Sequence, residues 1–325
     1  MGATAAAPAA HAASSRSSGP LDGLDDLLTY GLPRPAGEAS VPTVAAAVQE
    51  SRTQFLACRY TDLARTLPQR LALAQALGDD AGHTATAQLW CVASRVAIKC
   101  GDDRMTAVAA DRAVTAAARA SSPLVMAEAL RMVSSAHRRH GQHERATQVA
   151  VRAADMLDSA HDTHRTGLLS TRGNLLATAA YSAAKAGDGP GARDLLNAAR
   201  FHDRELGRSI KAPGACGYFG PAQVALHEVS VHHLLGDAGA AIATARGIPT
   251  TGLPRERRVR LHWEMARAHL LWGRDRECLA QLFEIERLAA QDVRRPAAHA
   301  LALDLARRAQ PVPGALAFTR RIGAA

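Results

Sequence analysis

Gly141-Gln142-His143-Glu144-Arg145-Ala146 ends one apolar helical run and begins the next, and this arrangement recurs along the chain. In each copy a glycine closes the run and a small residue follows five places later. The copies pair Gly101 with Thr106, Gly141 with Ala146, Gly187 with Ala192, Gly236 with Ala241, and Gly273 with Cys278. Neighbouring copies lie about 40 residues apart, a period typical of stacked helical hairpins. One hairpin cannot bury its own apolar face, so we predict a continuous array.

A sixth, degenerate copy occupies residues 58–64, with the sequence Cys-Arg-Tyr-Thr-Asp-Leu-Ala. The composition agrees with a helical array, because 47% of the 325 residues are hydrophobic but only 4% are aromatic, and alanine dominates. Small side chains allow helices to approach closely, and β-branched alternating runs are nearly absent. We therefore predict an all-α fold.

Glycine and proline breaks divide the periodic part of the chain into about six hairpins and a C-terminal capping helix. We expect hairpins at residues 43–77, 83–120, 123–157, 166–206, 219–247 and 255–290, the capping helix at 296–309, and a short tail helix within 314–325. Residues 41–325 then form one α-solenoid domain. Residues 1–40 are rich in Ala, Ser, Pro and Gly and are predicted to be a disordered segment and linker, with a short amphipathic turn at 21–30.

The chain is basic, with a formal net charge of +9, and nearly all of the positive charge is arginine. Such a balance suits a nucleic-acid or acidic partner. The arginines are scattered along the sequence, which favours solvated helix faces over one binding stripe. Direct nucleic-acid binding through this surface stays open as an alternative.

The cysteines, the N-terminus and the apolar runs indicate the cellular compartment of the protein. The five cysteines are odd in number and contain no CxxC pair, which argues against a disulfide framework and for a reducing environment. The first 20 residues make a poor signal peptide, and no run is long and apolar enough to cross a membrane. We therefore expect a cytoplasmic protein without a membrane partner.

Catalytic and metal-binding patterns are weak. His137, His140 and His143 are spaced by three, but a glycine separates the last from the others and no Cys or carboxylate completes a ligand set. The glycine-rich stretch 187–191 lacks the Lys-Ser/Thr of a phosphate loop, and no nucleophile elbow or dinucleotide fingerprint is present. We expect no catalytic residue, no metal and no cofactor, and so not an enzyme.

The loops resemble a known repeat. Residues 141–146 and 273–278 look like the junction between the two helices of a tetratricopeptide repeat (TPR), although the hairpins are longer than usual and the consensus Trp and Tyr of the first helix are mostly missing. This resemblance implies a TPR-like superhelical array, whose first helices line a concave groove.

A closer resemblance covers most of residues 43–309. The strings at 110–114 (Ala-Asp-Arg-Ala-Val), 219–227 (Phe-Gly-Pro-Ala-Gln-Val-Ala-Leu-His) and 273–275 (Gly-Arg-Asp) are similar to the C-terminal sensor region of actinobacterial XRE-family transcriptional regulators. Those proteins place a helix-turn-helix domain before the sensor region. Only about 40 residues precede the first hairpin here, so we expect the sensor region without that DNA-binding domain.

The groove carries the candidate site. Six residues on the first helices of the fifth and sixth hairpins are expected to converge on a partner: Gln223, His227, Glu228, His262, Trp263 and Arg267. The partner is a protein or peptide, with a small ligand as the alternative, and Trp263 would serve as a stacking anchor. The competing interpretation places Trp263 in the core and gives His227 an internal hydrogen bond.

These observations favour a non-catalytic regulatory module that binds a partner or senses a ligand and is linked to transcriptional regulation. Two alternatives remain at this point: a DNA-binding regulator that uses its arginine-rich surface, and an accessory protein of a biosynthetic pathway. A homodimer also remains open.

Overall fold

The computed structural model describes residues 21–158, 165–207, 213–214, 217–308 and 312–324. The predicted disorder of residues 1–20 concerns residues outside these ranges. The described chain is helical almost throughout, which confirms the all-α prediction. Its one strand pairing joins β1 (Pro213–Gly214) to β2 (Gly217–Tyr218), antiparallel and two residues long.

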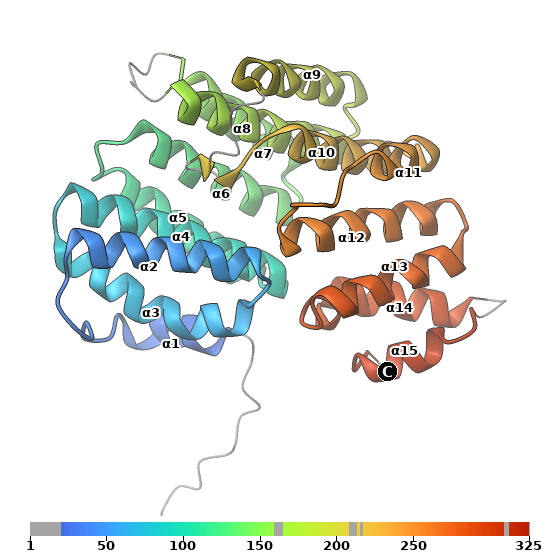
Figure 1. Cartoon of the computed structure of the whole chain (residues 1–325), viewed down its shortest axis with the longest axis horizontal. Helices are drawn as coiled ribbons and strands as arrows, with labels where there is room; N and C mark the ends of the chain where they lie inside the picture. The colour runs from blue at the N-terminus through green and yellow to red at the C-terminus, as the bar shows by residue number, and fades with distance from the viewer. Residues whose placement is uncertain (1–20, 159–164, 208–212, 215–216, 309–311, 325) are drawn as a thin grey trace, which may run out of the picture.

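Six antiparallel helix pairs follow one another along the chain, from the blue α2 to the orange α12 and α13 of Figure 1. The pairs are α2 (Val41–Leu56) with α3 (Tyr60–Leu77), α4 (Asp80–Cys100) with α5 (Asp103–Ala117), α6 (Pro123–Arg139) with α7 (His143–Asp155), α8 (Arg165–Lys185) with α9 (Gly189–Leu206), α10 (Pro221–Leu234) with α11 (Ala238–Arg246), and α12 (Arg255–Leu271) with α13 (Asp275–Leu288). A 3₁₀ turn, η2 (Asp292–Arg294), leads into α14 (Pro296–Arg307) and α15 (Ala315–Arg321).

The repeated loop has one backbone geometry. The five loop glycines have φ between 71° and 86°, the left-handed region where a side chain is unfavourable. The residue five places after each glycine is completely buried in every copy. In the degenerate copy Cys58 adopts φ 59°, the one described non-glycine residue with positive φ, and Leu63 five places later is buried. The periodic sequence pattern therefore marks a periodic backbone feature.

Helix starts are set by capping side chains, which explains small shifts from the predicted boundaries. The second hairpin begins at Asp80, three residues earlier than expected, because the Asp79 carboxylate accepts a hydrogen bond from the backbone N–H of Gly82 at 2.8 Å. Asp102 caps α5 in the same way, with 2.7 Å to the N–H of Met105. Ser122 caps α6, and Pro123 occupies the first turn of this helix.

The N-terminal linker is shorter than predicted. Residues 22–30 form a full helix, α1 (Asp22–Tyr30), which packs on α3 and buries Leu24 and Leu27. Gly23 permits this contact, since a Cβ there would lie 2.8 Å from the carbonyl oxygen of Ala64. The short amphipathic turn expected at 21–30 is thus a nine-residue helix, and its leucines find an apolar partner in α3.

The array closes on itself. The first helices stack in the order α2, α4, α6, α8, α10 and α12, and α12 also contacts α2 at the opposite end of the series. Lys99 of α4 pairs with Glu256 of α12 at 2.6 Å, and the backbone N–H of Tyr60 donates to Oε1 of Gln291 at 3.1 Å. The first helices thus form an inner ring, and the second helices lie outside it.

Candidate functional site

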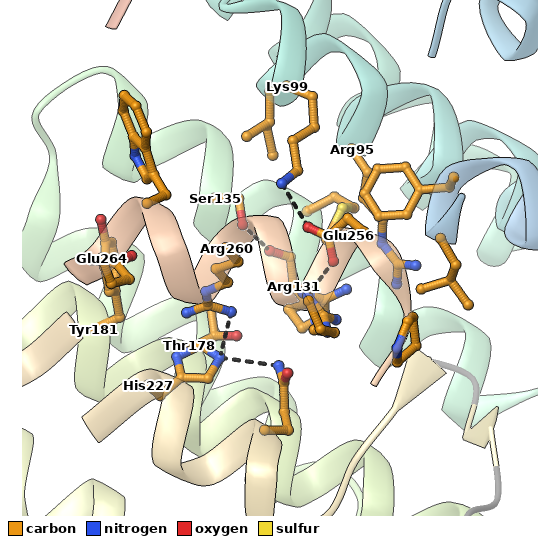
Figure 2. A pocket seen from close by; sticks show the side chains of 18 of the residues that line it. Arg95, Lys99, Arg131, Ser135, Thr178, Tyr181, His227, Glu256, Arg260 and Glu264 are labelled. Carbon is orange, nitrogen blue, oxygen red and sulfur yellow. Dashed lines mark hydrogen bonds and ion pairs between the residues drawn. The ribbon is translucent and has the colours of Figure 1, made fainter. Parts of the chain in front are cut away.

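A cavity of about 690 Å³ occupies the middle of the inner ring, and we call it the central cavity. Side chains from α2, α4, α6, α8, α10 and α12 all line it, so every hairpin contributes through its first helix. Figure 2 shows lining side chains from several of these helices pointing toward one another. The volume falls in the range of small-molecule sites in proteins.

The lining is strongly cationic. Eleven lining residues are arginine or lysine and two are glutamate. The cations are Arg52, Arg95, Lys99, Arg131, Arg138, Arg139, Lys185, Arg257, Arg260, Arg267 and Arg295; the glutamates are Glu256 and Glu264. Three further carboxylates outside the lining pair with some of these cations, namely Glu128, Asp103 and Asp292. Cations still outnumber carboxylates about two to one.

Helical spacing produces this concentration of charge. On α12 the lining residues Glu256, Arg260, Trp263 and Arg267 recur at intervals of three and four, which places them on one helix face. Arg131, Ser135 and Arg138 do the same on α6, and Thr178, Tyr181 and Lys185 on α8. The prediction that the arginines occupy only scattered, solvated faces is therefore wrong for this subset, because the stripes are short and converge only after the ring closes.

One buried carboxylate joins the two ends of the ring. Glu256 is 2% exposed and contacts Lys99 at 2.6 Å and Arg257 at 2.8 Å. Burial alone would raise the pKa of this carboxyl, but Arg257 and Lys99 together hold its pKa well below the usual range. Glu256 is therefore ionised, and one cation from α4 and one from α12 share its single negative charge.

A second buried carboxylate links the first three hairpins. Glu128 of α6 is 1% exposed and pairs with Arg95 of α4 at 2.6 Å and with Arg52 of α2 at 3.6 Å. Like Glu256, it draws two cations from neighbouring helices onto one anion. These two networks fix the α2, α4 and α6 side of the central cavity.

An arginine cluster surrounds His227 and is formed by Arg131 and Arg138 of α6 and by Arg257 and Arg260 of α12. Burial lowers the pKa of His227 well below its usual value, and these four guanidinium groups lower it further. Arg260 Nη1 lies 3.4 Å from His227 Nε2, and Gln223 Nε2 lies 3.2 Å from the same atom (Figure 2). Because a guanidinium only donates, Nε2 of the neutral ring accepts and the proton resides on Nδ1. That Nδ1 is buried and has no hydrogen-bond partner among the described residues.

Two arginines of this cluster lack an anionic partner in the described part of the chain. Arg138 contacts the hydroxyls of Ser182 and Ser135 at 3.2 and 3.1 Å and stacks over Tyr181 at 5.0 Å. Burial lowers the pKa of Arg138 to about 10, with neighbouring arginines adding to the effect. No described carboxylate lies within 4.0 Å of the guanidinium of Arg138 or Arg260.

An apolar and aromatic wall completes the cavity. Phe55, Ile98 and Met132 line it from α2, α4 and α6. Trp263 of α12 is partly buried, and the guanidinium of Arg295 lies 4.9 Å from its ring centroid. The lining thus combines cations with apolar and aromatic side chains on the same helices, and Phe55 and Met132 among them are almost fully buried.

Four of the six predicted groove residues line the central cavity: Gln223, His227, Trp263 and Arg267. The other two are absent from its lining. Glu228 pairs with Arg200 of α9, and His262 Nδ1 lies 2.7 Å from Gln281 Oε1 of α13, so each contacts a second helix. Arg131, Arg138 and Arg260 line the cavity but were not among the predicted groove residues. The three- and four-residue spacing of polar groups on first helices would have indicated them.

The other candidate features have local partners. His137 Nδ1 lies 2.6 Å from Gln142 Oε1, and His140 Nδ1 lies 2.9 Å from the carbonyl oxygen of Ala136. Within the described ranges, no group of three His, Cys, Asp or Glu residues is arranged to hold a metal ion. The glycine-rich stretch at 187–191 begins α9, where Asp188 caps the N–H of Gly191 at 2.8 Å.

No protein-family model matches the chain, and no curated protein matches it significantly. Among the described helices, none has the length and apolar character needed to cross a membrane.

Proposed function

We propose that this protein is a non-catalytic, TPR-like regulatory module that senses a ligand in the central cavity and passes the signal to a protein partner. One observation carries the proposal: the inner faces of all six hairpins converge on one cavity whose cations exceed its carboxylates. Because every hairpin touches the cavity, a bound ligand contacts the whole ring and favours one curvature of the stack over others. The outer second helices then present a different surface to the partner.

The cellular setting is part of the same proposal. The resemblance to XRE-family sensor regions suggests control of transcription in the cytoplasm through a partner that reads DNA. Direct DNA binding through the arginines described above is disfavoured by size, since a cavity of 690 Å³ has the dimensions of a small-molecule site and not of a duplex.

A pull-down from nuclease-treated native lysate tests the proposal, with the full chain as bait at low and at high salt. A matched bait carries Arg138→Gln and Arg260→Gln, which alter the cavity and leave the outer helices unchanged. We expect a discrete protein partner that survives high salt and whose recovery differs between the two baits. A parallel pull-down uses the same lysate without nuclease. If nucleic acid dominates what is recovered there and is lost at high salt, the result supports a DNA-binding regulator instead.

A further inference from the structure

We infer that the ligand of the central cavity is an organic phosphate of nucleotide size, with its phosphate groups at the arginine cluster and a flat apolar group at the Trp263 side. This inference rests on the proposed function and specifies the chemistry of its ligand.

The charge of the cluster calls for a compact anion. Arg138 and Arg260 have no described carboxylate within ion-pair distance, and Arg131 and Arg257 lie near the same histidine. Like charges held together in a partly buried site repel one another, and an incoming anion relieves that repulsion. A phosphate carries up to two charges on one small group and accepts the two parallel N–H donors of a guanidinium.

The hydrogen-bonding groups of the cluster are mainly donors. The guanidinium groups only donate, and Nε2 of His227 already accepts from Gln223 and Arg260. Nδ1 of His227 and Nε of Arg257 are donors without a described partner, but both atoms are buried, as is the unpartnered acceptor Oε1 of Gln223. A ligand group made only of acceptor oxygens matches such a site better than one that brings donors.

The size of the cavity requires more than an inorganic ion. About 690 Å³ exceeds the volume of a phosphate several-fold, and the lining also includes Phe55, Ile98, Met132, Tyr181 and Trp263. Aromatic and aliphatic side chains of this kind bind flat ring systems by stacking and apolar burial. A ring system linked to one or more phosphates matches both kinds of lining side chain. The contact between α12 and α2 bounds the space, which disfavours an extended acidic peptide.

Isothermal titration calorimetry on the full chain tests the inference. The probes are ADP, GDP, adenosine, pyrophosphate, citrate and a tetraglutamate peptide, each at fixed ionic strength. We expect ADP or GDP to bind with one site per chain, pyrophosphate and citrate to bind at least ten-fold more weakly, and adenosine to show no binding. In Arg138→Gln and Arg260→Gln we expect nucleotide affinity to fall about 10- to 100-fold, the loss typical of a charge-assisted hydrogen bond. The matched control Arg287→Gln alters an exposed arginine of α13, outside the cavity, and should bind like the original chain.

Several results would overturn the inference: no nucleotide binding, equal binding in the cavity variants, or citrate, pyrophosphate or a tetraglutamate peptide binding as tightly as the nucleotides. Melting temperatures of the ligand-free variants separate lost binding from lost folding, and we expect Arg260→Gln, which removes fewer contacts than Arg138→Gln, to stay folded. If the nucleotides fail while the pull-down still captures a cavity-dependent partner, the proposed function stands and only the phosphate assignment falls.

Discussion

The seams, meaning the packed contacts between neighbouring helices, and the central cavity differ in the size and charge of their side chains. In the seams, alanines such as Ala109, Ala150 and Ala199 are fully buried. In the cavity, long charged side chains line open space and two carboxylates serve several cations. These alanines lie on the second helices α5, α7 and α9, whereas the helices that line the cavity are the first helices.

The contrast separates what folds the chain from what the chain does. Close apolar packing stabilises the array, whereas gathering arginines without matching carboxylates opposes folding. Residues that conflict with stability in this way are expected at functional sites.

Removing the carboxylate that closes the ring should have the largest effect. Glu256→Ala leaves Lys99 and Arg257 buried without their shared anion and adds to the charge beside the arginine cluster. Breaking one partner of a buried ion pair typically costs about 3 to 5 kcal/mol. Urea unfolding at pH 7 should show a decrease of this size in the free energy of unfolding.

The matched control is Glu284→Ala, whose partner Arg287 is exposed on α13. Exposed pairs contribute little to stability. If Glu256→Ala were as mild as this control, Glu256 would not hold the two ends of the ring together.

A substitution that overfills the packed interior should lower the free energy of unfolding somewhat less than Glu256→Ala does. Gly173 of α8 packs against the buried ring of Phe219, and a Cβ there would lie 2.1 Å from its Cζ. Gly173→Ala forces that ring to move and should lower the free energy of unfolding by about 3 kcal/mol. Gly239→Ala is the control, because its Cβ would lie 3.7 Å or more from other atoms and the change should be within about 0.5 kcal/mol. A larger loss of unfolding free energy in Gly239→Ala would contradict the free space described around Gly239.

The sequence predicted the fold better than the site. The glycine with a small residue five places later is a local signal, because both residues belong to one turn, and all five copies have the predicted geometry. The arginine cluster has no local signal of that kind. Arg138 and Arg260 lie more than 100 residues apart and meet only because α12 returns to the start of the stack. Glu228 and His262 do not line the cavity because first helices also have faces toward second helices, the preceding one (α9) for Glu228 and its own (α13) for His262.

Acidic pH should lower the free energy of unfolding through two histidines of α10, His227 and His233. Burial lowers the pKa of His233 to about 4, with Arg267 adding to the shift and Glu264 opposing it, and His227 is lowered as well. The unfolded chain takes up these protons near pH 6.5, so stability is complete above that pH and is lost as the pH falls toward 4. Between pH 7.5 and 5.0 His233 should account for about 2 kcal/mol.

Urea unfolding of the original chain and of His233→Gln at both pH values measures this contribution. The variant should lose about 2 kcal/mol less than the original chain over the interval. Parallel pH profiles in the two proteins would show that the proton on His233 is not linked to folding.

The smallest effect should have the opposite sign. Arg260→Gln removes a guanidinium with no described carboxylate in ion-pair distance, while the new amide retains a donor for Nε2 of His227. Because the charge of Arg260 disfavours the charged forms of both Arg138 and His227, the ligand-free variant should be more stable by about 1 kcal/mol. Added salt should reduce this gain, since screening weakens the same repulsion in the original chain. A destabilised variant would mean that Arg260 stabilises the ring as Glu256 does. The cavity would then contribute to folding stability, as the apolar seams do.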